Sequence, residues 1–219
     1  MDRQFFLDPK SIHPQGEPLR IQIPIPPALR ALSAIPNAEN MRAGDLVLFA
    51  SLDDHAGAVA DGIKKVQSSG GYSDQDARWS HAAVYLGFDF RICEATRSGV
   101  RAASLLDYTP THLIRVRRDP HLELEAGWKI SVLAACQIGT AYGFGTILTL
   151  ARRAVKGYWS PNPQTAHAGD GKICSELYSD CYAAASGRTL WNNLALEATP
   201  AYLSATAQLS DVEVGWRPL

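Results

Sequence analysis

The sequence lacks any run of about 18 uninterrupted apolar residues, the length that a membrane-spanning helix needs. It also lacks an excess of either charge. Its 219 residues include 21 Lys and Arg against 22 Asp and Glu, for a formal net charge of −1. A protein that grips nucleic acid through phosphates needs a basic excess. We therefore expect no general nucleic-acid binding.

The first residues also do not have the pattern of a secretory signal peptide. Residues 1–10 contain two aspartates, and prolines interrupt residues 14–36, so no basic region is joined to an apolar stretch. We expect a protein that stays in the cytoplasm, or one that is exported by a secretion system needing no signal peptide.

Cysteine is scarce, and the four present are not spaced as a disulfide framework or a zinc site. Cys174 and Cys181 fall on one predicted helix, about 10 Å apart along its axis, which is too far for a disulfide. Cys93 and Cys136 fall in a strand pattern and a helix pattern. No CxxC or HxxxH spacing occurs. We expect four free thiols, no metal and no cofactor.

The chain has enough apolar residues, 46 %, to bury one good core, and no linker divides it. Residues 1–40 are rich in proline, with six prolines between 14 and 36, and are expected to form an extended arm over the domain, with a short helix at 27–33. Residues 41–203 are expected to form the domain itself. Residues 204–219 are expected to be a tail packed on it, with an edge strand at 212–214.

Helix and strand patterns are segregated along the chain rather than strictly alternating. Strands are predicted within 41–50, 79–87, 90–95 and 113–117, with a further extended piece from 99. Helices are predicted over 56–66 with Asp53 or Asp54 as the N-cap, over 123–138, over 146–157, over 172–187 and from Thr199–Pro200. This order favours an α+β fold with a small, mostly antiparallel sheet.

Two polar stretches are assigned to the surface. Residues 72–79 are expected to form a mobile polar segment. Arg115, Arg117 and Arg118 are expected to form a solvated strand face, with a carboxylate- or phosphate-binding patch as the alternative.

The predicted helix at 172–187 has a cysteine in its first turn. Glycines at 169 and 171 precede it and Gly187 ends it. A thiol at a helix N-terminus faces unpaired N–H groups and the positive end of the helix dipole, which favour thiolate over thiol. Cys174 is therefore a candidate nucleophile. The alternative is a small apolar core residue, since free cysteines are often buried.

A cysteine nucleophile needs a base, and the base needs a third group to orient its ring. His81 and Glu94 fall on two successive strands joined by a tight turn. A loop at 87–88 pairs them directly, and a loop one residue later makes them diagonal neighbours; both registers place them on one face. If the Cys174 helix packs across this sheet, the three residues converge. The alternatives are a core histidine and an edge-strand carboxylate facing water.

Two further residues are candidates for binding an oxyanion or the substrate. Tyr142 could offer its hydroxyl, and Ser175 follows the candidate nucleophile. The backbone N–H of Cys174 is a third candidate donor.

Six groups of short motifs, in order, carry a resemblance to a known family. They are GDLVLF at 44–49, SHAAVYLG at 80–87, EA with GV at 94–95 and 99–100, IGTAY at 138–142, CSEL at 174–177 and TP at 199–200. Together they resemble the circularly permuted branch of the NlpC-type papain-like superfamily, in particular the YiiX-like group of bacterial cysteine hydrolases. The resemblance covers about residues 41–203. It implies a papain-like fold whose small antiparallel sheet packs on the helix carrying Cys174 as nucleophile, with His81 as general base and Glu94 as its orienter.

The resemblance also implies an activity, that of a cysteine peptidase or amidase acting through a thioester. The expected substrate is a peptide or amide bond of bacterial peptidoglycan, cut during cytoplasmic recycling or by an exported antibacterial effector, which would have an immunity protein. One alternative is a lipid-directed acyltransferase or thioesterase. For it, Arg152, Arg153 and Lys156 would make the 146–157 helix a membrane-surface contact, which is not favoured. The other alternative is a binding module without turnover.

Overall fold

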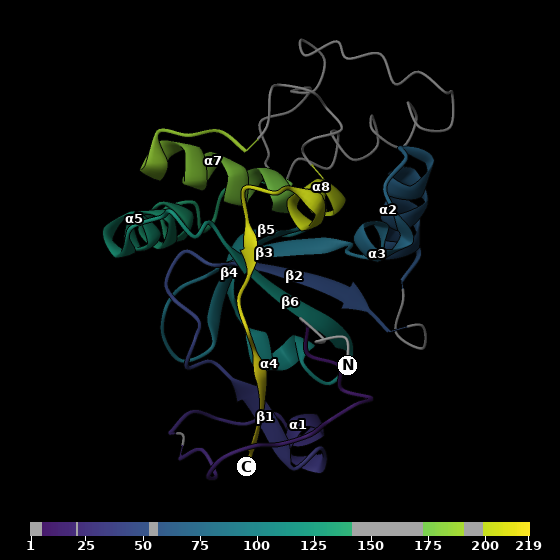
Figure 1. Cartoon of the computed structure of the whole chain (residues 1–219), viewed down its shortest axis with the longest axis vertical. Helices are drawn as coiled ribbons and strands as arrows, with labels where there is room; N and C mark the ends of the chain where they lie inside the picture. Colours follow the sequence, from purple (N-terminus) through teal and green to yellow (C-terminus); the bar gives the residue numbers. More distant parts are fainter. Residues whose placement is uncertain (1–5, 21, 53–56, 142–172, 191–198) are drawn as a thin grey trace.

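The computed structural model describes residues 6–20, 22–52, 57–141, 173–190 and 199–219 (Figure 1). Its centre is a six-stranded sheet in the order β5-β4-β3-β2-β6-β7, in which every neighbouring pair is antiparallel. The strands are β2 (Leu46–Ser51), β3 (His81–Tyr85), β4 (Arg91–Thr96), β5 (Gly99–Ser104), β6 (His112–Arg118) and β7 (Ser210–Asp211). The predicted α+β class with an antiparallel sheet is confirmed.

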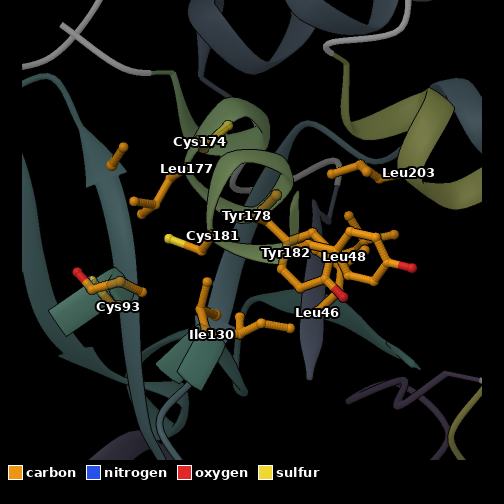
Figure 2. Packing of buried hydrophobic residues seen from close by; sticks show 14 of the residues in the cluster. Leu46, Leu48, Cys93, Ile130, Cys174, Leu177, Tyr178, Cys181, Tyr182 and Leu203 are labelled. Atoms are coloured by element: carbon orange, nitrogen blue, oxygen red, sulfur yellow. Dashed lines mark hydrogen bonds between the residues drawn. The ribbon is translucent and has the colours of Figure 1, made fainter. Parts of the chain in front are cut away.

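One face of the sheet is covered by α5 (Leu124–Ala135), α7 (Cys174–Ser186) and α8 (Pro200–Ala205) (Figure 1). Alternate strand residues point toward these helices, as the period of two in a strand requires. The apolar cluster between them is shown in Figure 2; it includes Leu46, Leu48, Cys93, Ile130, Cys174, Leu177, Tyr178, Cys181, Tyr182 and Leu203.

Helix α7 has the ends that the sequence predicts. It starts at Cys174 and ends at Gly187, whose φ of 68° is left-handed and whose N–H donates to the Ala183 carbonyl. Its outer half is anchored by Tyr182, which donates a 2.5 Å hydrogen bond to the buried Asp119. The helix is therefore fixed along its length, which holds Cys174 in place.

The second face of the sheet carries the N-terminal and C-terminal segments. Here lie α1 (Pro27–Ala31), β1 (Ala34–Asn37), α4 (Leu105–Tyr108) and β8 (Gly215–Pro218), and β1 pairs antiparallel with β8. Leu7, Leu29 and Ile35 of the N-terminal segment are at most 2 % exposed. These residues form part of a core cluster and not a loose covering.

Two helices flank the end of the sheet, and both differ from the prediction. Helix α2 (Ala58–Ser69) is capped by Gly57 rather than by Asp53 or Asp54, which fall outside the described residues. The segment expected to be mobile contains α3 (Asp74–Ala77), capped by Ser73. The buried Gln67 side chain fixes this segment, because it donates 2.9 Å hydrogen bonds to the carbonyls of both Ala77 and Trp79.

The arginines of β6 are paired and buried or half-buried, so the expected solvated face is wrong. Arg115 makes a bidentate bond to Asp211, at 2.6 and 2.9 Å. Arg117, only 6 % exposed, donates to the carbonyls of Leu203 and Ser204 at 2.8 and 2.6 Å. Carbonyls at the end of α8 and the Asp211 carboxylate thus take the place of water.

Arg118 and the C-terminal edge strand also differ from the prediction. Arg118 pairs at 2.6 Å with the buried Asp45 carboxylate, which also accepts from the N–H of Arg42, three residues earlier. The edge strand expected at 212–214 lies instead at β7. Val212 and Val214 follow β7 and are buried in the second core cluster, and the Val212 N–H still donates to the Val116 carbonyl of β6 at 2.9 Å.

Candidate active site

Cys174 is the first residue of α7 and is 5 % exposed. The N-cap residue before it is Ile173, whose apolar side chain has no acceptor for the N–H groups of the first turn. The Ile173 N–H itself donates to the Glu176 side chain at 3.1 Å. The thiol therefore lies at the N-terminal end of α7, where the Glu176 carboxylate of the same turn accepts one backbone N–H and the positive end of the helix dipole faces the sulfur.

His81 and Glu94 are diagonal neighbours on β3 and β4. In the observed register Ala83 lies opposite Glu94, so the turn is centred one residue beyond 87–88. The turn contains Asp89 and Phe90 at φ of 46° and 55°. The imidazole Nε2 and the carboxylate Oε2 are 2.7 Å apart.

The meeting point of the three residues is the end of the sheet. His81 and Glu94 point to the face opposite α7, where the His81 ring lies 5.7 Å from that of Phe49. His81 and Cys174 are each the first residue of their element, and their side chains are hydrogen-bonded there. The structure brings the three residues together, but around the end of β3 and not across one face as expected.

The His81 ring is held in its charged form. Burial alone would lower its pKa, but the hydrogen bonds to Cys174 and Glu94 and the charges of both outweigh burial and raise the pKa to about 10. Since Nε2 bonds to Glu94, Nδ1 is the ring nitrogen left to face the thiol. This arrangement allows a proton to pass between Cys174 and His81.

Glu94 is a completely buried carboxylate with both oxygens occupied. Oε2 accepts from His81 and, at 2.6 Å, from the Tyr108 hydroxyl; Oε1 accepts from Nε and Nη2 of Arg101, both at 2.9 Å. Burial would raise its pKa, but His81, Tyr108 and Arg101 together lower it to about 2. The carboxylate therefore stays ionised, and it has the donors that a buried charge requires.

Tyr108 fixes both Glu94 and His81, and the sequence analysis did not identify it. It ends α4, the short helix after β5, and its ring is stacked at 6.1 Å from the His81 ring and 4.4 Å from the Phe49 ring. It thus restrains the imidazole directly by stacking and indirectly through the carboxylate.

Arg101 was also missed, although the sequence holds a signal for it. Residues 97–98 form a two-residue turn between β4 and β5, which places Arg101 directly opposite Glu94. An acidic and a basic residue at such a cross-strand position predict an ion pair. Tyr108 has no comparable signal, because its position depends on how α4 folds back over the sheet.

The two remaining candidates receive little support. Ser175 is fully buried as the second residue of α7. Tyr142 lies outside the described residues.

All four cysteines are free thiols, as predicted. Within the described segments, no group of three or more His, Cys, Asp or Glu side chains could hold a metal ion. No helix among these segments is long and apolar enough to cross a membrane.

Tyr108→Phe is expected to keep the ring stacking and remove one hydrogen bond from Glu94. A hydrogen bond to a charged group contributes about 2 kcal/mol, so the free energy of unfolding in denaturant should fall by that order. The pKa of His81, followed by NMR of its ring nitrogens, should change as well.

Tyr202→Phe is the matched control for Tyr108→Phe. It also loses a hydroxyl hydrogen bond, to the Leu190 carbonyl on the α8 side. Tyr202→Phe is expected to lower the free energy of unfolding and to leave the titration of His81 unchanged. If both variants left that titration unchanged, Tyr108 would not position His81.

The stability of the protein is expected to fall on both sides of weakly acidic pH. The lowered pKa of Glu94 contributes stability above its usual value of 4.5, and this contribution is lost as pH falls toward about 2. The raised pKa of His81 contributes stability below its usual value of 6.5, and this is lost as pH rises toward about 10. Denaturant unfolding across pH measures both limbs. His81→Asn should flatten the alkaline limb, and an unchanged alkaline limb would contradict the assignment.

Comparison with known proteins supports the fold. No protein-family model matches the chain, and no curated protein matches it. Among solved structures, the metalloprotein YiiX from Escherichia coli O157:H7 matches with a TM-score of 0.52 and 18 % identity, over 78 % of this chain and 96 % of that one. The protein is therefore a mixed α+β protein with antiparallel sheets. Its particular fold is similar to that of YiiX.

Proposed function

We propose that this protein is a cysteine hydrolase with Cys174 as nucleophile, His81 as general base and acid, and Glu94 as the group that orients His81. One observation carries the proposal: the His81 ring lies between the Cys174 thiol and a fully buried carboxylate 2.7 Å away. Nucleophile, base and orienter are the three parts that thiol-dependent acyl transfer needs.

The reaction follows from the positions of these groups. In the resting site His81 already holds the proton of Cys174, and the thiolate attacks the carbonyl carbon of the substrate. The backbone N–H of Cys174, at the N-terminus of α7, stabilises the developing oxyanion. His81 gives its proton to the leaving amine, which leaves a thioester. Water, deprotonated by His81, then attacks the thioester and releases the acid and the thiol.

The chain order supports a permuted papain-like fold of the NlpC type. The histidine strand precedes the cysteine helix in the sequence, and that helix packs on an antiparallel sheet. The resemblance favours a peptide or amide of bacterial peptidoglycan as the substrate. The protein would then act in cytoplasmic recycling, or as an exported antibacterial effector with an immunity protein.

A metal does not fit the proposed site. YiiX is described as a metalloprotein. Here both oxygens of Glu94 already accept hydrogen bonds, and two of the donors are on the cationic guanidinium of Arg101, which opposes a second cation beside it. The mechanism therefore uses no metal.

The proposal is tested by incubating peptidoglycan, and separately phospholipid vesicles, with wild type and with Cys174→Ala. Mass spectrometry of the products identifies any bond that is cut. New muropeptides from wild type alone support the cell-wall substrate, and released or transferred fatty acid supports the lipid alternative. The predicted basic helix at 146–157, on which that alternative rests, lies outside the described residues.

If neither substrate is cut, the reactivity of Cys174 decides what remains. Iodoacetamide labelling in a Cys136→Ser background removes the exposed thiol and leaves the three buried ones. If Cys174 is labelled rapidly, and if Glu94→Gln slows this labelling, the result would support a thiol hydrolase that acts on another substrate. A Cys174 no more reactive than the buried Cys93 would favour a binding module and contradict the proposal.

A further inference from the structure

Large exposed hydrophobic side chains gather around α5. The described residues contain six of them, and five lie on this helix, just after it or in the turn beside it: Phe88, Leu124, Trp128, Val132 and Ile138, between 46 % and 59 % exposed. The sixth, Val59 on α2, is 39 % exposed. Scattered exposed apolar residues need no explanation, but a cluster of this kind marks a surface that binds something.

Three of these residues form one stripe along the helix. Leu124, Trp128 and Val132 are spaced four apart, so they share one side of α5. The indole of Trp128 extends the stripe over the β3–β4 turn, since its Cη2 lies 3.0 Å from where a Cβ on Gly87 would be. Phe88 follows directly. We call Phe88, Leu124, Trp128 and Val132 the α5 patch.

The other side of α5 is already used by the core. Ile130 and Ala134 are buried in the cluster between the sheet and α7, and Gly127 is buried against the backbone of Ala43 and Gly44. The helix is thus apolar on two sides, which is typical of a helix covered on both. In Figure 1 α5 lies at the margin of the molecule, away from α2 and α3. The patch is also remote from His81. His81 is the first residue of β3, whereas Gly87, beside the patch, follows the last residue of that strand.

The charges beside the patch indicate what covers it. Asp89 and Glu125 are acidic, Arg91 and Lys129 are basic, and Glu125 bonds to Lys129 at 2.8 Å with both side chains more than half exposed. An anionic lipid surface selects a basic excess, which these residues lack. A rim with both signs is complementary to a second copy of itself, because each acidic residue can face a basic one.

We propose that the α5 patch is a homodimer interface in which two copies of α5 pack antiparallel about a two-fold axis near Trp128. That axis places Leu124 against the partner subunit's Val132 and the two Trp128 rings together. Glu125 of one subunit and Lys129 of the partner subunit are then offset by two residues, about 3 Å along the helix axis. Their long side chains span this offset. The interface does not depend on the proposed activity.

Sedimentation of the full chain, from micromolar to submillimolar concentration, tests the interface. Wild type should show a monomer–dimer equilibrium. Leu124→Lys should raise the dissociation constant by about tenfold or more, because it places a charge in the apolar contact with the partner subunit's Val132, which occurs twice in the dimer. Val59→Lys is the matched control, an exposed hydrophobic residue on another helix, and should leave the dissociation constant unchanged.

Charge reversal identifies the occupant as a second copy. Glu125→Lys and Lys129→Glu should each weaken the dimer, and the double reversal should restore it, with thermal unfolding checking that all variants fold. A single-chain mass at every concentration would overturn the proposal, as would a dimer that Leu124→Lys does not weaken. Flotation of monomeric wild type, but not of Leu124→Lys, with phosphatidylglycerol vesicles would assign the patch to a lipid surface instead.

Discussion

Replacing Cys174 with alanine is expected to lower kcat/KM by a factor on the order of 10⁴ or more, since it removes the atom that attacks the substrate. The fold should survive, because the change deletes one sulfur from a residue at the end of the core cluster and costs about 1 kcal/mol. With a slow ester substrate, wild type should gain the mass of the acyl group and Cys174→Ala should not.

Cys181→Ala is the matched control for Cys174→Ala. Cys181 lies on the same helix, is equally buried at 5 %, and belongs to the same core cluster. It should keep full turnover. Equal losses in both variants would contradict a nucleophilic role and indicate that Cys174 is a packing residue.

The elements that the sequence predicts well are those with signals next to each other in the chain. The ends of α7 follow from a cysteine after a glycine-containing loop and from Gly187, and α8 follows from Thr199, whose side chain accepts from the Tyr202 N–H. The register between β3 and β4 was left open between two values. The turn that decides it holds Phe90 at positive φ, a conformation that a bulky residue rarely adopts and that its identity does not predict.

Contacts between distant parts of the chain account for the errors. The sequence predicts a solvated face for Arg115 and Arg117 because the groups that pair with them are distant in the chain. These groups, the carbonyls of Leu203 and Ser204 and the Asp211 carboxylate, lie 86 to 96 residues later. In the same way, strand alternation places His81 and Glu94 on one face but does not say that α7 covers the other. Local pattern thus gave the members of the candidate site, whereas only the fold shows that they meet at the end of the sheet.

Replacing Glu94 with glutamine is expected to have the second largest effect, on both catalysis and stability. All the groups that surround this side chain are donors: His81 Nε2, the Tyr108 hydroxyl and the Arg101 guanidinium. An amide of the same shape presents N–H groups to some of them and leaves the Arg101 charge without its partner. We expect the free energy of unfolding to fall by about 3 kcal/mol. We expect kcat/KM to fall by a factor on the order of 10³ to 10⁴, because an amide can hold the imidazole in the wrong tautomer.

The acid limb of stability separates a loss of charge from a loss of packing. Wild type should lose stability as pH falls from about 4.5 toward about 2, where Glu94 takes up a proton. Glu94→Gln has nothing to protonate there, so its unfolding free energy should fall less over the same range. Glu213→Gln, at an exposed position away from Glu94, should behave as wild type. If Glu94→Gln kept the full acid limb, the ionised carboxylate would not be what holds His81, and the orienting role would pass to its neighbours Tyr108 and Phe49.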